Sequence, residues 1–252
     1  MKIRISQQRV TRDVDNNKSS IIKVISKSLK DEWIIFPEGM LSGYYPEDEN
    51  YINSLNWEEL QKSIEEIQQA VKKNNVNCLF GTALYENENW YNSEIFLSKS
   101  GAKQIYKKVN LATLDRRCFV AGDKLDVYED GGVKFGIQLC RDNAFPEQWK
   151  ILKQKGAQIV FHINNAIKEN DINRKHVLIS RAFENQFFVA SVNNADHPQT
   201  LPSLVISPFG KILFESRPQE ESVDTIEIDL SEVKTDYLNQ ERKDLVEVVY
   251  KK

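Results

Sequence analysis

Segments with the pattern of strands alternate with segments with the pattern of helices along almost the whole chain. Short apolar runs rich in branched and aromatic side chains, such as residues 33–38 and 158–163, favour buried strands. Longer stretches carry apolar residues at helical spacing, as Leu60 and Ile64 do within residues 57–74. Strands are expected at 2–7, 33–38, 76–84, 134–140, 158–163, 187–193 and 223–229, and helices at 18–30, 57–74, 147–155 and 171–186.

Three turn sequences indicate hairpins within this alternation. They lie at residues 86–89, 99–102 and 208–210, each between strand-like runs. Alternating helices and strands predict a layered α/β fold, and the hairpins indicate that its sheets are mixed rather than purely parallel. We therefore expect helices on the outside of packed sheets.

One domain is expected to account for residues 1–252, because no Gly/Ser/Pro-rich linker and no internal repeat divides the chain. Its core should span about residues 2–230, and residues 231–252 form a charged C-terminal extension.

Charge and cysteine content limit the partners and the compartment. The formal net charge of −3, with both signs interspersed, provides no basic face for nucleic acid. No apolar run approaches the ~20 residues that cross a bilayer, and the first residues lack the apolar block of a signal peptide. Three widely spaced cysteines do not suggest a disulfide framework, so a reducing cytoplasm fits best.

Three residues with complementary chemistry follow predicted strands. Glu38 ends the run Trp-Ile-Ile-Phe-Pro, Lys108 follows Gln-Ile-Tyr-Lys, and Cys140 lies between a strand and a predicted helix. Ligand sites of α/β sheets collect at the carboxyl ends of strands, so the three side chains could share one crevice. A carboxylate can accept the thiol proton, and an ammonium group can stabilise a thiolate or an oxyanion.

Taken singly, each residue also has an ordinary structural explanation. Free cysteine is among the most buried residue types, and Glu38 and Lys108 could be loop and surface charges. The other candidates point more clearly to structure. Cys78 lies in an apolar strand, Cys118 in a loop, and the scattered histidines lack metal-ligand spacing, so we expect no metal site.

The motifs around these residues resemble the three signature segments of the nitrilase superfamily, the carbon–nitrogen hydrolases. The segments are Phe-Pro-Glu38, Tyr-Lys-Lys108-Val-Asn-Leu and Gly-Ile-Gln-Leu-Cys140-Arg-Asp, in that order. Later stretches, including Ser-Arg-Ala-Phe-Glu-Asn185 and the run at 203–210, are also similar to that family. The resemblance covers about residues 2–230.

This resemblance implies a four-layer αββα sandwich and a Glu–Lys–Cys catalytic set of an amidase-like branch. Glu38 would be the general base, Lys108 the electrostatic stabiliser and Cys140 the nucleophile, with the backbone N–H of Arg141 in the oxyanion hole. A small linear amide or carbamoyl compound would be cleaved through a thioester with release of ammonia. The family resemblance also implies no metal or cofactor, and a homodimer.

The chain departs from the family pattern near the site. Asp115 stands where many members have a second glutamate, and could position Lys108 or the substrate with a shorter side chain. Ala144 stands where amidase-like members have an arginine that binds a substrate carboxylate. Arg141 could replace that arginine or pair with a nearby acid, and the sequence leaves both open.

Two other functions fit the same residues. An amine or alcohol could intercept the thioester, which would make the protein an acyltransferase. A non-catalytic metabolite-binding protein could use the same scaffold, although the joint presence of Glu38, Lys108 and Cys140 argues against it.

Overall fold

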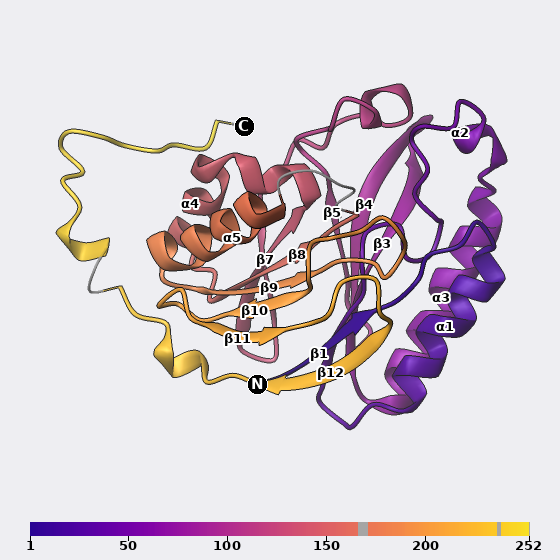
Figure 1. Cartoon of the computed structure of the whole chain (residues 1–252), viewed down its shortest axis with the longest axis horizontal. Coiled ribbons are helices and arrows are strands. Elements are labelled where there is room, and N and C mark those ends of the chain that lie inside the picture. Colours follow the sequence, from indigo (N-terminus) through magenta and orange to yellow (C-terminus); the bar gives the residue numbers. More distant parts are fainter. Residues whose placement is uncertain (166–170, 236–237, 252) are drawn as a thin grey trace.

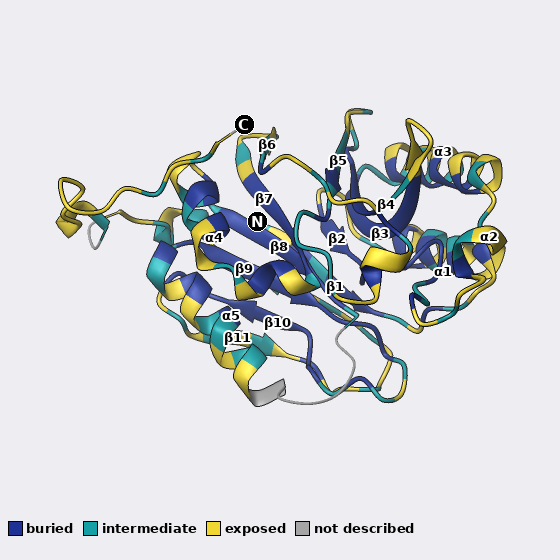
Figure 2. Cartoon of the chain, turned by 90° about the horizontal axis from the view of Figure 1, so that it is seen from above, coloured by how far each residue is buried: buried dark blue, intermediate teal, exposed yellow. Residues whose placement is uncertain are grey.

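Two six-stranded sheets lie face to face, with helices on their outer sides (Figure 1). The structure is a computed structural model that describes residues 1–165, 171–235 and 238–251, without the side chains of residues 171 and 172. Buried positions concentrate in the strands, and the helices expose one face (Figure 2). This arrangement confirms the predicted α/β sandwich of two mixed sheets.

The first sheet has the order β12-β1-β2-β3-β4-β5, in which β1, β2 and β3 are parallel and the other pairings antiparallel. Helices α1 and α3 pack together on its outer face (Figure 1). The bounds are β1 Lys2–Gln7, α1 Val14–Ser26, β2 Trp33–Ile35, α2 Tyr51–Ser54, α3 Trp57–Asn74, β3 Asn77–Glu86, β4 Asn89–Leu97, β5 Lys103–Lys107 and β12 Ser222–Glu227.

The second sheet has the order β11-β10-β9-β8-β7-β6, with β7, β8 and β9 parallel. Helices α4 and α5 cover its outer face, and the predicted hairpin at 208–210 joins β10 to β11. The bounds are β6 Val127–Asp130, β7 Val133–Leu139, α4 Pro146–Gln154, β8 Ile159–Ile163, α5 Asp171–Asn185, β9 Phe188–Val192, β10 Leu204–Ile206 and β11 Ile212–Glu215.

An aromatic cluster joins the two sheets. The indole of Trp33 on β2 stacks on Phe96 of β4 at 5.2 Å and on Phe161 of β8 at 5.7 Å between ring centroids. Phe135 of β7 completes the cluster and lies edge-on to Trp33 at 5.2 Å. Burial of such large apolar surfaces is the main force that holds two sheets together. The interface therefore fixes how strand ends of one sheet face those of the other.

The first helix begins earlier than the apolar pattern predicts. It was expected at 18–30, but α1 runs from Val14 to Ser26, because the Asp13 side chain caps it by accepting a hydrogen bond from Asn16 N at 2.8 Å. Leu29, expected on the apolar side of this helix, lies beyond its end and is exposed. The short helix α2 was not predicted.

The C-terminal extension follows β12 with two short 3-10 turns, Leu230–Glu232 and Leu238–Gln240. Residues 236, 237 and 252 of the predicted extension lie outside the described residues. The Tyr250 hydroxyl donates a hydrogen bond to the Asp123 carbonyl at 2.8 Å, so the end of the extension contacts the body of the protein. Within the described residues, no helix is long and apolar enough to cross a membrane.

Candidate active site

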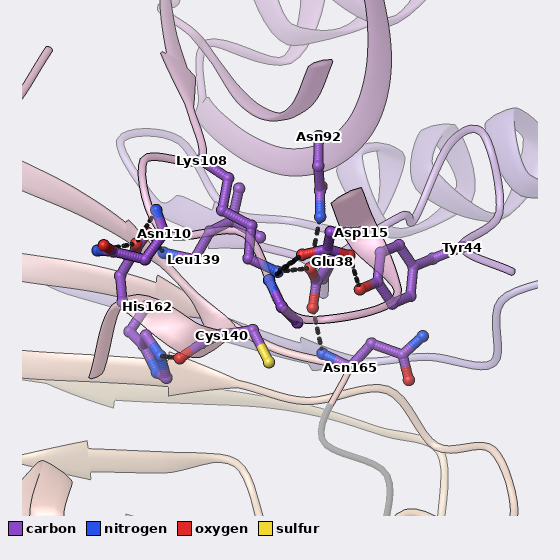
Figure 3. Close-up of polar contacts among 12 residues, drawn as sticks. Glu38, Tyr44, Asn92, Lys108, Asn110, Asp115, Leu139, Cys140, His162 and Asn165 are labelled. Atoms are coloured by element: carbon purple, nitrogen blue, oxygen red, sulfur yellow. Dashed lines mark hydrogen bonds and ion pairs between the residues drawn. The ribbon is translucent and has the colours of Figure 1, made fainter. Parts of the chain in front are cut away.

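Glu38 lies just beyond β2, in a pocket without exposure to solvent. Its Oε1 accepts hydrogen bonds from Asn92 Nδ2 at 2.7 Å and Lys108 Nζ at 3.0 Å, and its Oε2 accepts one from Asn165 N at 2.7 Å (Figure 3). Gly81 of β3 packs against the Glu38 backbone, where an added Cβ would come within 2.7 Å of Glu38 Cα. The carboxylate is thus held by partners from three other segments.

Lys108 follows β5 and lies between two carboxylates. Its Nζ is 3.0 Å from Glu38 Oε1 and 2.7 Å from Asp115 Oδ2, and all three side chains are fully buried. Burial alone would lower the pKa of Lys108, but Glu38, Cys140 and Asp115 together raise it above its ordinary value. Burial raises the pKa of Glu38, and the charge of Lys108 opposes that shift. We infer that the ammonium group stays charged throughout the accessible pH range.

Asp115 occupies the place where a glutamate was expected, and its shorter side chain still reaches Lys108. Its Oδ2 also accepts a hydrogen bond from Ala112 N at 2.9 Å, and its Oδ1 accepts one from the Tyr44 hydroxyl. Asp115 lies in a short 3-10 turn, Asp115–Arg117, that brings the carboxylate back toward β5. Of the two roles considered for Asp115, these contacts favour positioning Lys108.

Cys140 follows β7 with a backbone φ of +40°, a left-handed conformation that is strained for a residue other than glycine. Its sulfur points toward the space beside Glu38 (Figure 3). A five-residue 3-10 turn, Cys140–Ala144, separates this residue from α4, Pro146–Gln154, which matches the helix predicted at 147–155. The strained turn, rather than a long helix, aims the thiol into the site.

The thiol is not pre-ionised. Burial and the charge of Glu38 raise the pKa of Cys140 to about 11, although Lys108 and Arg174 act in the opposite direction. From the sequence, Glu38 was expected to accept the thiol proton and Lys108 to stabilise the thiolate. In the structure the thiol is protonated at neutral pH, so a base has to remove its proton during any attack.

Asp142 holds the Cys140 turn against the loop that follows Lys108. Its Oδ2 accepts hydrogen bonds from Leu139 N at 2.9 Å and the Tyr106 hydroxyl at 2.7 Å, and its Oδ1 accepts two from Asn110 at 2.9 Å. This buried carboxylate links the two sheets beside the site. The sequence analysis quoted Asp142 only as part of a motif and assigned it no role.

Asn92 and His162 also support the site. Asn92 of β4 binds Glu38 as described above. The ring of His162 lies between Ser191 Oγ, 3.1 Å from Nδ1, and the Cys140 carbonyl oxygen, 3.1 Å from Nε2. Burial lowers the pKa of His162 to about 4, so the ring is neutral and braces the turn. No group of metal-binding side chains occurs within the described ranges.

Arg141 follows Cys140 in the 3-10 turn. Its side chain is exposed, and it has no ion pair among the described residues. Pairing with a nearby acid, one of the two roles considered for Arg141, is therefore not seen in the described part of the chain. Cys78 is buried in the core and Cys118 is partly buried, as expected for structural cysteines.

A further buried acid, Glu94, lies next to the site on β4, two residues from Asn92. Within the described structure, neither of its carboxyl oxygens has a hydrogen-bond partner, and the side chain has no exposed surface. Burial and the nearby charge of Glu38 raise the pKa of Glu94 well above its ordinary value. The register places Glu94 beside Gly81 and Tyr106. Glu94 is thus a neutral carboxylic acid in the wall behind Glu38.

Replacing Glu94 by glutamine should make the stability of the fold less dependent on pH. The pKa of Glu94 is higher in the folded state than in the unfolded state, where it is about 4.3. Its contribution to the stability of the fold is therefore complete below that unfolded-state pKa and is lost as the pH rises through the folded-state pKa. Between these two pKa values, we expect the free energy of unfolding of Glu94→Gln to rise relative to that of the parent protein by up to about 1.4 kcal/mol per pH unit.

Thermal unfolding at pH 5 and pH 8 measures this effect. Glu129, an exposed glutamate on β6, provides the matched control as Glu129→Gln. If the unfolding temperatures of the parent protein and of Glu94→Gln changed equally between pH 5 and pH 8, Glu94 would be ionised in the folded protein.

The carbon–nitrogen hydrolase family model matches residues 2–236 of this chain. The chain is a carbon–nitrogen hydrolase. It is 29% identical to an (R)-stereoselective amidase of a Pseudomonas species, over 96% of this chain and 92% of the relative. It is 31% identical to the 2-oxoglutaramate amidase of Bacillus subtilis, over 86% of each chain. The chain thus belongs to the nitrilase superfamily and its amidase-like branch, and it is an amidohydrolase that acts on C–N bonds.

Solved structures agree on the fold. A mutant of the Nesterenkonia AN1 amidase, from the nitrilase superfamily, superposes with a TM-score of 0.84 at 20% identity, over 97% of this chain and 95% of the other. The four-layer sandwich implied by the signature segments is confirmed.

Proposed function

We propose that this carbon–nitrogen hydrolase cleaves small linear amides or carbamoyl compounds through a cysteine thioester, with Glu38, Lys108 and Cys140 as its catalytic residues. One observation carries the proposal: a fully buried Glu38–Lys108 pair faces a thiol that a strained turn directs into the same space. The amidase relatives support the choice of amide over nitrile substrates.

The first half of the reaction forms the thioester. Glu38 takes the proton from the Cys140 thiol as the sulfur attacks the amide carbon, which is needed because the resting thiol is protonated. Lys108 and the backbone N–H of Arg141 stabilise the oxyanion. The C–N bond then breaks, Glu38 returns the proton to the departing nitrogen, and ammonia leaves.

The second half releases the acid. Glu38, again a carboxylate, takes a proton from a water molecule, which attacks the thioester carbon. The C–S bond breaks, the thiolate recovers the proton from Glu38, and a carboxylic acid departs. Asp115 and Asn92 act as positioning residues, since they fix Lys108 and Glu38 by direct hydrogen bonds.

A screen for ammonia release tests the function. Amides, carbamoyl compounds and dicarboxylate monoamides should include at least one substrate that the protein hydrolyses and that Cys140→Ser does not. Adding hydroxylamine or simple alcohols shows whether acyl transfer competes, because the new acyl product then appears beside the acid. If none of these three substrate classes releases ammonia, and Cys140 reacts with thiol reagents no faster than Cys118, a non-catalytic binding protein is the better explanation.

We propose a homodimer located in the cytoplasm. The three free cysteines fit a reducing compartment. Two large apolar side chains on the outer side of the second sheet, Phe183 of α5 and Phe209 of the β10–β11 turn, are 51% and 55% exposed, which is typical of an interaction surface. Light scattering on a sizing column should give about twice the chain mass of 29.2 kDa, and a mass near 29.2 kDa would refute the dimer.

A further inference from the structure

A small cavity lies beside the catalytic cluster, between loops of the first sheet and the loops that follow β8 and β9 in the second. Its volume is about 180 Å³, and its wall includes polar side chains from three separate segments. Its polar lining comprises Tyr44, Tyr45, Glu47, Asn165, Asn194, Asp196, His197 and Gln199. Since a water molecule takes up about 30 Å³ of liquid, the cavity has room for a group of several heavy atoms.

Two lining residues connect this cavity directly to the catalytic cluster. The backbone N–H of Asn165 donates to Glu38 Oε2 at 2.7 Å, and the Tyr44 hydroxyl donates to Asp115. The Lys108 ammonium lies 5.7 Å from the centre of the Tyr44 ring. Figure 3 shows Asn165 and the Cys140 sulfur on the same side of Glu38. A substrate carbonyl at Cys140 would therefore direct its acyl substituent toward this cavity.

The charges of the cavity wall are acidic. Glu47 and Asp196 line it, and no lysine or arginine does so among the described residues. Asp196 accepts a hydrogen bond from Val10 N at 3.1 Å; burial raises the pKa of its carboxyl, while that hydrogen bond and Arg9 oppose the shift. The amide groups of Asn165 and Gln199, which also line the cavity, bind each other.

Arg9, next to the lining residue Val10, acts on the Asp196 carboxyl, and the other nearby cations are paired or lie elsewhere. Lys108 is neutralised by Glu38 and Asp115. Arg12 pairs with Asp48 at 2.8 Å. Arg174 on α5 acts on the Cys140 thiol, but it is not part of this wall. A carboxylate that entered the cavity would meet the carboxyl groups of Glu47 and Asp196 and no lysine or arginine among the described lining residues, which is unfavourable.

We infer that this enzyme selects amides whose acyl group carries a neutral or positively charged end, and discriminates against those that end in a carboxylate. The inference rests on the proposed function, because it assigns the acyl group of that reaction to this cavity. This preference would distinguish the protein from amidases that hydrolyse dicarboxylate monoamides. Ala144 agrees with it, because the arginine expected at that position for carboxylate binding is absent.

The test compares three four-carbon amides that differ only in the terminal group: butyramide, 4-aminobutyramide and succinamate. We expect kcat/KM for each of the first two to exceed that for succinamate by about 10-fold or more. Equal or faster hydrolysis of succinamate would overturn the inference while leaving the proposed function in place, and would point to Arg174 as a carboxylate-binding residue.

A second measurement does not need turnover. Iodoacetamide and iodoacetate differ in charge but react with thiols in the same way. The ratio of their rates at Cys140, divided by the same ratio for free cysteine in solution, should favour iodoacetamide by about 10-fold or more. A normalised ratio near one would overturn the inference even if no amide were hydrolysed, and a lack of hydrolysis would count against the proposed function alone.

Variants locate the effect in the cavity. Glu47→Gln and Asp196→Asn should each raise kcat/KM for succinamate relative to butyramide by about 3- to 10-fold, because each removes a repulsive charge. The exposed Glu129→Gln serves as the matched control, and its ratio should equal that of the parent protein. An unchanged ratio in both cavity variants would show that the acyl group lies elsewhere.

Discussion

Replacing Cys140 by serine should lower kcat/KM for amide hydrolysis by about 10³-fold or more while the fold stays intact. The pKa of the Cys140 thiol is raised to about 11, which is still within reach of a carboxylate base that passes the proton on during attack. An alcohol is a far weaker acid, so Glu38 could not activate it in the same way. The serine side chain differs little in size and fits the same strained turn.

Initial rates of ammonia release measure this loss, and circular dichroism with thermal unfolding verifies the fold. The matched control is Cys118→Ser, because Cys118 is a partly buried cysteine whose sulfur makes only a weak contact, 3.9 Å from the Pro46 carbonyl oxygen. We expect this control to retain its activity. If Cys140→Ser kept activity within 10-fold of the parent, the nucleophile would have to be another group.

The positions of Glu38 and Cys140 could be predicted from the sequence because each ends a strand that a local apolar pattern identifies, whereas Lys108 follows a hairpin arm after the turn at 99–102. Local patterns also indicate which elements form the two sheets. What brings the three side chains together is the packing of one sheet on the other, through contacts such as Trp33 with Phe161. No local pattern contains that contact, so the convergence depended on the resemblance to a known family.

The supporting residues were harder to predict, since their roles depend on register and loop shape. Asn92 and Glu94 share a face of β4 with Phe96, and the two-residue spacing was a signal that could have placed them toward the second sheet. Asp142 acts through partners on other strands. The cavity joins Glu47 to Asp196, which lie far apart in the sequence, so its acidic character appears only in the folded chain.

Replacing Glu38 by glutamine should abolish turnover, with a fall in kcat/KM of about 10³-fold or more, without making Cys140 less reactive toward alkylating reagents. The two effects separate because Glu38 acts on the thiol in two ways. As a base it accepts the proton and later delivers it to the departing nitrogen, and glutamine can do neither. As a charge it raises the pKa of Cys140, so its removal favours the thiolate beside Lys108.

Ammonia release and iodoacetamide labelling of Cys140 at pH 7 measure the two effects on the same samples. Glu94→Gln is the matched control, because it makes the same change in a neighbouring buried acid that is already neutral, and we expect its turnover to stay within about 10-fold of the parent. In the parent protein, kcat/KM should also fall as pH decreases toward the raised pKa of Glu38, because the protonated carboxyl cannot act as a base. Slower labelling in Glu38→Gln would mean that Glu38 promotes thiolate formation at rest, and retained turnover would mean that another group transfers the proton.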